Sequence, residues 1–95
     1  MIIIVTGDPG SGKTSFVTSL PDQERRMIAF LDSKFFDPDS LIQLLHSYPN
    51  QCWVVEIADY EFVAYLSQSL ECHIVEAGDQ EEILNLIRSH NEKNA

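Results

Sequence analysis

The chain has 95 residues, of which 44% are hydrophobic, and its six Lys/Arg against fifteen Asp/Glu give a net charge of −9 at pH 7. A chain of this length forms one small domain, and its acidity disfavours nucleic-acid binding on its own. The apolar run at residues 2–5 is shorter than a membrane span and lacks the flanks of a signal peptide. We therefore expect a cytoplasmic protein with no membrane contact.

The cysteines and histidines predict neither a disulfide framework nor a Cys/His metal site. Cys52 and Cys72 are twenty residues apart, outside any CxxC motif, and each lies beside strand-like residues. Buried free thiols are the favoured interpretation, and a disulfide is the alternative that a reducing compartment disfavours. The three histidines lack the spacing of metal ligands.

The first quarter of the chain predicts a buried strand, a glycine-rich loop and a helix. Residues 2–6 form a continuous apolar run without alternation, which is typical of a strand covered on both faces of a parallel sheet. A helix is expected over residues 13–20, because Pro21 cannot continue it. The sequence PDQERR at residues 21–26 is interpreted as a polar connection.

A second strand and a second helix follow. Residues 27–31 are apolar and end at Asp32. Asp37 and Pro38 then form a cap followed by proline at the first helical position. The helix they begin has a broad apolar face at helical spacing and stops at Pro49.

The last half of the chain repeats this alternation of strand and helix. A third strand is predicted over residues 52–58, with Asp59 placed to cap the next helix. A fourth, short strand is predicted over residues 72–75. Asp79 and Glu82 have the spacing of a capping box at the start of the last helix.

Strands that alternate with helices indicate an α/β fold with right-handed crossovers and helices on both faces of the sheet. We predict a minimal three-layer α/β/α sandwich around a four-stranded, mainly parallel sheet. The domain is expected to span residues 1–90, and residues 91–95 are expected to be a polar tail.

The segment after the first strand carries the most specific motif in the chain. Gly7, Gly12, Lys13 and Thr14 match G-x-x-x-x-G-K-[ST], in which glycines let backbone N–H groups surround phosphate oxygens. The lysine places its charge on the β- and γ-phosphates, and the threonine hydroxyl can bind Mg²⁺ at a helix N-terminus. The predicted phosphate-binding set is Gly7, Asp8, Pro9, Gly10, Ser11, Gly12, Lys13, Thr14 and Ser15.

A chance glycine-rich turn is the alternative interpretation of this segment, and the flanking strand and helix argue against it. The sequence GDPGSGKTS resembles the Walker A loop of the P-loop NTPase superfamily, and its Pro9-Gly10 form is similar to loops of AAA-type ATPases and small nucleotide kinases. The resemblance implies an α/β core that binds Mg²⁺ with a nucleoside triphosphate, usually ATP or GTP. It also implies a catalytic role for Lys13.

The superfamily also has an acidic residue at the end of a second strand, which holds Mg²⁺ through water. Glu56, after the apolar residues of strand three, is our first choice for this metal-binding and water-activating role. Asp32, which closes a run of the form hhhhD, is the second choice for the metal. Asp59 is equally well explained as a helix cap. Strand three gives neither the usual hhhhD nor hhhhDE, so metal binding and hydrolysis are less securely implied than nucleotide binding.

Basic and aromatic residues near the predicted strand ends are further candidates. Arg25, Arg26 and Lys34 could act on the phosphate of a neighbouring subunit, although solvated surface charge is the more common role for such residues. For Phe35 and Phe36, we expect one ring to be packed and the other to be available to a base or a partner.

Three functions are compatible with these features. The first is a slow Mg²⁺-dependent ATPase that needs a protein partner or self-assembly. The second is a non-hydrolysing nucleotide- or phosphate-binding module that regulates a partner, since compact P-loop chains resemble accessory proteins of viral or mobile-element genomes. The third is a nucleotide or nucleoside kinase, which the lack of an acceptor-binding insertion disfavours. A signalling GTPase is disfavoured by the lack of an NKxD-like sequence.

Overall fold

A computed structural model describes residues 1–7, 20–76 and 78–93 of the chain. Most of the predicted loop and the predicted helix over residues 13–20 lie outside these ranges. Within them the strands are β1 (Ile2–Thr6), β2 (Ile28–Asp32), β3 (Cys52–Glu56) and β4 (His73–Glu76). The helices are α2 (Asp22–Arg26), the 3₁₀ turn η1 (Ser33–Phe35), α3 (Pro38–Ser47), α4 (Tyr60–Ser69) and α5 (Gln80–Lys93).

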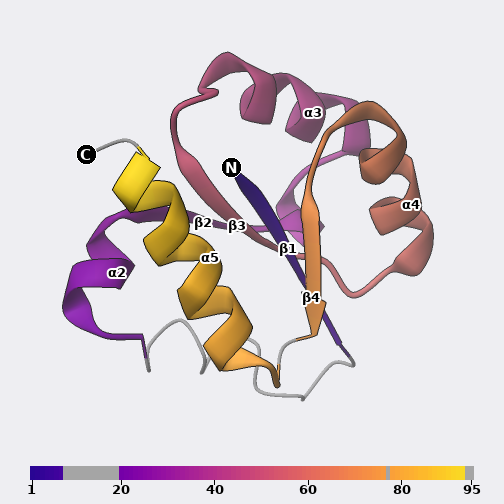
Figure 1. Cartoon of the computed structure of the whole chain (residues 1–95). Coiled ribbons are helices and arrows are strands. Elements are labelled where there is room, and N and C mark those ends of the chain that lie inside the picture. The colour runs from indigo at the N-terminus through magenta and orange to yellow at the C-terminus, as the bar shows by residue number, and fades with distance from the viewer. Residues whose placement is uncertain (8–19, 77, 94–95) are drawn as a thin grey trace.

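The four strands form one sheet in the order β2-β3-β1-β4, and every pairing is parallel (Figure 1). β1 and β3 are therefore central among the described strands, and β2 and β4 lie at the edges. This arrangement confirms the predicted α/β fold with a four-stranded parallel sheet. The apolar runs of β1 and β3 reflect their position, because a central strand between helices is buried on both faces.

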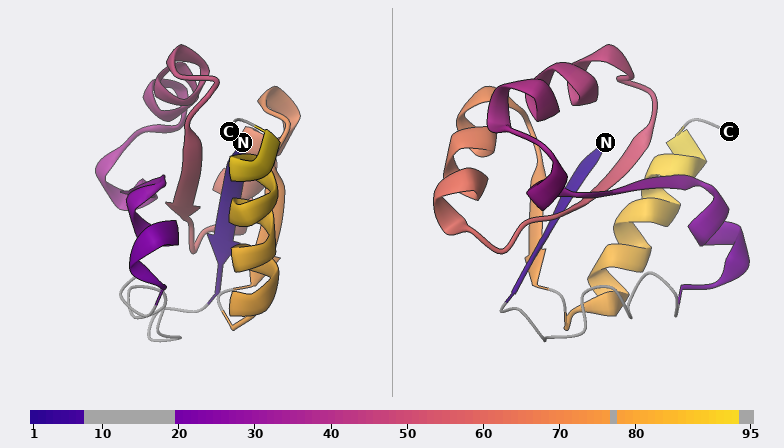
Figure 2. Two further views of the ribbon diagram at one scale, coloured as in Figure 1. Left: turned by 60° about the vertical axis from the view of Figure 1, so that its left-hand side comes forward. Right: turned by 180° about the vertical axis from the view of Figure 1, so that it is seen from behind.

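Alternate residues of each strand enter two separate hydrophobic clusters. Ile3 and Val5 pack with Ile83 and Ile87 of α5, while Ile4 packs against α3 and α4. The helices therefore cover both faces, α2 and α5 on one side and α3 and α4 on the other (Figures 1 and 2). Period-two alternation places neighbouring side chains on opposite faces of a sheet, so one central strand supplies both cores.

Aspartates begin three of the helices, as the sequence predicts. The side chain of Asp37 accepts hydrogen bonds from the backbone N–H and the hydroxyl of Ser40, at 3.1 and 2.7 Å. Both hydrogen bonds hold the pKa of Asp37 below its usual value, and the bond from the Ser40 hydroxyl has the larger effect. Asp59 accepts from the backbone N–H of Glu61 at 2.9 Å, and Asp79 from that of Glu82 at 3.3 Å. Each carboxylate satisfies an N–H that has no partner within its helix.

Two segments differ from the sequence-based expectation. The connection predicted at residues 21–26 contains the short helix α2, which has acidic residues in its first turn and Arg25 and Arg26 in its last. This charge order favours a helix through its dipole, and Glu24 is held against Arg88 of α5 at 2.9 Å. At the other end of the chain, α5 continues to Lys93, three residues into the predicted polar tail.

The remaining differences are small. β2 and β4 begin and end one residue later than predicted, and β3 ends at Glu56 although the N–H of Ile57 still donates to the carbonyl of Val5 at 3.0 Å. Both cysteines are free thiols, Cys52 buried and Cys72 partly buried, and burial raises the pKa of each. Of the helices in the described ranges, none is both long and apolar enough to span a bilayer.

Candidate functional site

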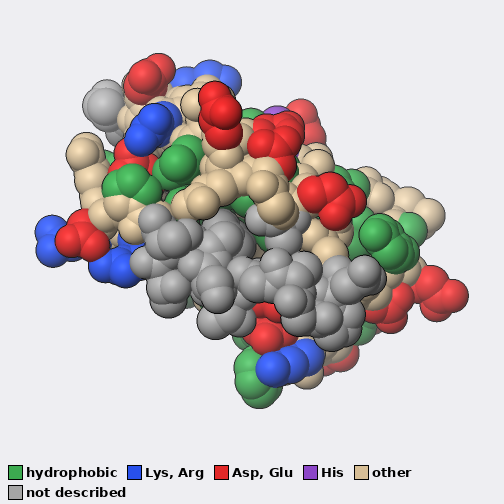
Figure 3. All heavy atoms as spheres, turned by 90° about the horizontal axis from the view of Figure 1, so that it is seen from below, with side chains coloured by type: hydrophobic (Ala, Val, Ile, Leu, Met, Phe, Trp, Pro, Cys, Tyr) green, Lys and Arg blue, Asp and Glu red, His purple; other side chains and the backbone are tan. Residues whose placement is uncertain are grey.

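The strand register gathers polar residues at the carboxyl edge of the sheet. Glu56 of β3 is paired with Val5 of β1 on one side and with Asp32 of β2 on the other. Thr6, the last residue of β1, is paired with Glu76 of β4. Ligands of open α/β sheets bind outside this edge. Figure 3 views the molecule from the side where β1 and β4 end, and Asp and Glu side chains stand at several places around its margin.

Gly7 is the one residue of the predicted phosphate-binding set that the structure describes. It follows β1 directly and has a φ of 155°, which side-chain-bearing residues rarely adopt. This backbone conformation favours a glycine where the chain leaves the central strand. Residues 8–15, including Lys13, Thr14 and Ser15, lie outside the described residues.

Glu56 is placed by β3 beside the strand that leads into the motif. Cys52 and Val54 of the same strand enter the cluster on the α2 and α5 face, so the alternation of the strand directs Glu56 to that face as well. Its side chain is half-buried, and its Oε2 atom is shielded from solvent. A shielded carboxylate oxygen at a strand end can hold a cation or accept a proton from water.

Asp32 lies level with Glu56, but its oxygens contact Lys34. Oδ1 accepts the backbone N–H of Lys34 at 3.1 Å and caps η1. Oδ2 lies 3.4 Å from the Lys34 ammonium. A metal at Asp32 would compete with this ammonium for Oδ2, and Asp32 lies one strand further from β1 than Glu56 does.

The other candidates are separated by the fold. Asp59 caps α4, so the capping interpretation of this residue is confirmed. Phe36 packs against the α3 and α4 cluster while Phe35 is 75% exposed, so one ring is packed as predicted and the other is exposed. The ammonium of Lys34 lies 5.2 Å from the centroid of the Phe35 ring, a cation–π geometry.

The predicted arginines lie on α2. Arg25 forms an ion pair with Asp22 of the same helix, and the side chain of Arg25 is 44% exposed. Arg26 is also exposed in the last turn of α2. Their positions leave both side chains on the outer surface, as expected for solvated charges.

Glu76 is an edge residue that the sequence reasoning did not select. It ends β4, is exposed, and is paired with Thr6 on the side of β1 opposite Glu56. The signal was its place directly after a short apolar run. From the sequence alone, a carboxylate that follows a strand can be either a ligand or a solvated surface charge. Only the pairing of β4 with β1 shows that Glu76 lies next to the strand that leads into the motif.

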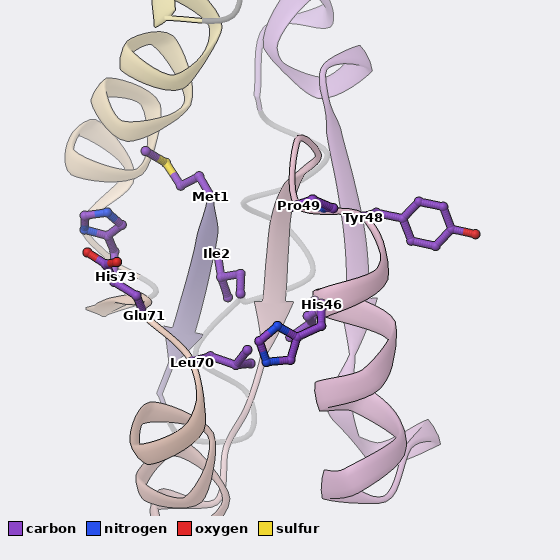
Figure 4. Close-up of a pocket in the computed structure, with 9 residues that line it drawn as sticks. Met1, Ile2, His46, Tyr48, Pro49, Leu70, Glu71 and His73 are labelled. Carbon is purple, nitrogen blue, oxygen red and sulfur yellow. The ribbon is translucent and has the colours of Figure 1, made fainter.

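A hollow of about 430 Å³ lies at the opposite, amino edge of the sheet. Its walls are the starts of β1 and β4 and the end of α3. Figure 4 shows Glu71 and His73 on the β4 side and His46 on the α3 side, while the ring of Tyr48 points away. The described ranges contain no group of three or more His, Cys, Asp or Glu that could hold a metal ion. This recess is lined by both apolar and polar residues, the polar ones being His46, Tyr48, Glu71 and His73.

Comparisons of the chain with protein-family models, with curated proteins and with solved structures gave no significant match.

Proposed function

We propose that this protein binds a nucleoside triphosphate with Mg²⁺ through residues 7–15 and hydrolyses it slowly as a P-loop ATPase. The observation that carries the proposal is the position of Glu56. This residue ends β3, the strand next to β1, and is paired with Val5 near the end of β1. Gly7, which begins the motif, has a φ of 155° that supports a glycine-dependent turn there. A loop that follows a central parallel strand is also suitably located for a phosphate group.

In this proposal each residue has a distinct role. The backbone N–H groups of residues 7–15 hold the phosphates, and Lys13 neutralises the β- and γ-phosphates. Thr14 and Glu56 would hold Mg²⁺, and Glu56 would orient the attacking water and accept its proton. Mg²⁺ supplies charge neutralisation of the triphosphate when it is bound.

Asp32, the second choice for the metal, forms local contacts to Lys34, two residues further along the chain. The ammonium of Lys34 is held at this same edge. The proposed activation of a slow enzyme by a partner or by self-assembly would supply a further positive charge to the phosphates.

The first test is calorimetric titration of ATP, GTP and ADP with and without Mg²⁺, followed by phosphate release on the same sample. Lys13→Ala is expected to weaken triphosphate binding by roughly 10–100-fold, since a charge-assisted contact to phosphate is lost. Glu56→Gln is expected to lower phosphate release by roughly 100-fold or more while nucleotide binding is nearly unchanged.

Glu76→Gln is the matched control, because Glu76 ends the strand on the other side of β1. It should retain phosphate release. An equal loss in Glu76→Gln and Glu56→Gln would contradict the assignment to Glu56. Undiminished triphosphate affinity in Lys13→Ala would contradict the proposal as a whole.

A non-hydrolysing nucleotide-dependent interaction module is the second candidate. It is favoured by the distribution of charge, because residues 35–87 contain ten carboxylates and no Lys or Arg. Tight binding without phosphate release in the same titration would select this function.

A further inference from the structure

The outer edge of β4 differs from the rest of the sheet. Among the described strands β4 pairs with β1 alone, so its other side presents backbone N–H and C=O groups that no described strand pairs. His73, Ile74 and Glu76 are exposed, whereas Val75 is buried in the core. Ile74 is 51% exposed, and an exposed β-branched residue on an edge strand favours pairing with another strand.

Acidic side chains flank this edge. Glu71 precedes β4 and Glu76 ends it, and both are exposed. Asp79, Glu81 and Glu82 follow at the start of α5 and are also exposed. The basic residues lie elsewhere in the chain, at residues 13, 25, 26, 34, 88 and 93. A second copy of this chain would therefore bring like charges together along β4, and a basic segment would bring opposite charges together.

We propose that β4 binds an extended, basic segment of another protein, in which Lys or Arg alternates with apolar residues, as a fifth strand of the sheet. Ile74 and Glu76 point to the same face of β4. The added strand would place its basic side chains on the face of Ile74 and Glu76, one of them opposite Glu76, and its apolar side chains on the face of Val75. In this mode of recognition, main-chain hydrogen bonds between the strands supply the affinity. Contacts of the alternate side chains, with side chains of β4 or with recesses beside it, supply the selectivity.

The recess at the amino edge supports this arrangement. Leu70 and Glu71 lead into β4 and His73 begins it, and all three line the recess. A segment running along β4 would reach this recess at one end and the exposed Glu76 at the other. The proposal is independent of nucleotide binding, and its test uses no nucleotide.

Fluorescence anisotropy with three labelled six-residue peptides tests the proposal on the intact chain. The first alternates Lys and Val, the second replaces each Lys by Glu, and the third keeps all three Lys but has Pro in place of the central Val. Only the first should bind, because Pro prevents strand pairing and Glu reverses the charge. Hydrogen exchange of the β4 amides should slow in the complex, while exchange in α2 stays unchanged.

Two variants and one control locate the contact. Glu76→Lys should weaken binding by about five- to tenfold, since an attractive cross-strand pair becomes repulsive. Ile74→Lys should weaken it further, and Glu92→Lys, an equal charge change on the last turn of α5, should leave it unchanged. Because Glu76 is exposed, Glu76→Lys remains informative if Ile74→Lys fails to fold.

Several results would overturn the proposal. Equal binding of the Pro-containing peptide would mean that charge alone attracts the ligand. Equal loss in Glu92→Lys and Glu76→Lys would place the contact elsewhere. Sedimentation that shows a dimer abolished by Ile74→Lys would assign the edge to a second copy, and no binding of the Lys/Val peptide would exclude the basic strand.

Discussion

The two faces of the sheet are stabilised in different ways. On one face the ten-residue helices α3 and α4 cover Trp53, Val55 and Ile57 with apolar side chains. On the other, α5 supplies Ile83 and Ile87, but α2 has only five residues. The described contacts that join α2 to α5 include a charged pair, Glu24 with Arg88.

This difference matters because Glu56 and Asp32 belong to the second face. Every second residue of a strand faces the same side of the sheet. Glu56 therefore shares a face with Cys52 and Val54, and Asp32 shares it with Ile28 and Phe30, all of which pack on the α2 and α5 side. The α3 and α4 face thus serves as a closed hydrophobic support. The candidate site is built on the face where an ion pair, Glu24 with Arg88, joins the two helices.

The largest effect is expected from the closed face. Leu66 on α4 is fully buried, so Leu66→Ala should lower the free energy of unfolding by about 2–5 kcal/mol through lost burial and the cavity left behind. This is a large part of the roughly 5–14 kcal/mol expected for a chain of this size. Urea unfolding followed by circular dichroism measures it.

Gln68→Ala, at an exposed position of the same helix, is the control for Leu66→Ala and should change stability by less than about 0.5 kcal/mol. Similar small losses in both variants would mean that the α4 face does not form the closed support described above.

A smaller effect is expected from the charged contact on the other face. The Glu24 side chain is 11% exposed and that of Arg88 is 53% exposed. Glu24→Gln removes the charge from this hydrogen bond and should lower the midpoint of thermal unfolding by about 4–8 °C. Glu92→Gln, on exposed α5 surface, should leave the midpoint unchanged. An equal midpoint for Glu24→Gln and the native chain would show that α2 is held by apolar contacts alone.

The same pair predicts a pH dependence. The hydrogen bond from Arg88, and then backbone hydrogen bonding, holds the pKa of Glu24 below its ordinary value of 4.5. The unfolded state therefore binds the proton more readily, and the stabilisation is complete at neutral pH. It declines as the pH falls below 4.5 and disappears below the folded-state pKa. Thermal midpoints of native protein and Glu24→Gln should converge as the pH falls through this range.

The smallest effect should come from the polar contact between α3 and α4. The Tyr65 hydroxyl donates to Oδ1 of Asp39 at 2.6 Å, and this hydrogen bond, followed by the carboxylate charge, raises the pKa of Tyr65. Tyr65→Phe should lower the thermal midpoint by less than about 4 °C, because the pair is exposed and the apolar packing remains. Tyr60→Phe on the same helix should have no effect. If Tyr65→Phe lowered the thermal midpoint more than Glu24→Gln does, the polar contact between α3 and α4 would contribute more stability than the ion pair between α2 and α5. That result would contradict the comparison of the two faces.

The sequence by itself determined the alternation of elements and three of the helix starts. Asp37, Asp59 and Asp79 were recognisable because a cap depends on residues only two or three positions away. The apolar run of β1 likewise indicated a strand that is buried on both faces. The short helix α2 was missed because its polar residues have no apolar period, and its contact to Arg88 joins residues 64 positions apart.

The tertiary structure decided which strand ends are neighbours. From the sequence, Glu56 was the first choice and Asp32 the second among carboxylates at two strand ends. The strand order places Glu56 beside β1 and Asp32 one strand further away, where Lys34 contacts both of its oxygens. Strand order depends on how helices pack across a sheet, and no local pattern in a single strand encodes it. The motif at residues 7–15 identifies the chemistry that we propose, and the fold places Glu56 nearer than Asp32 to the strand that leads into this motif.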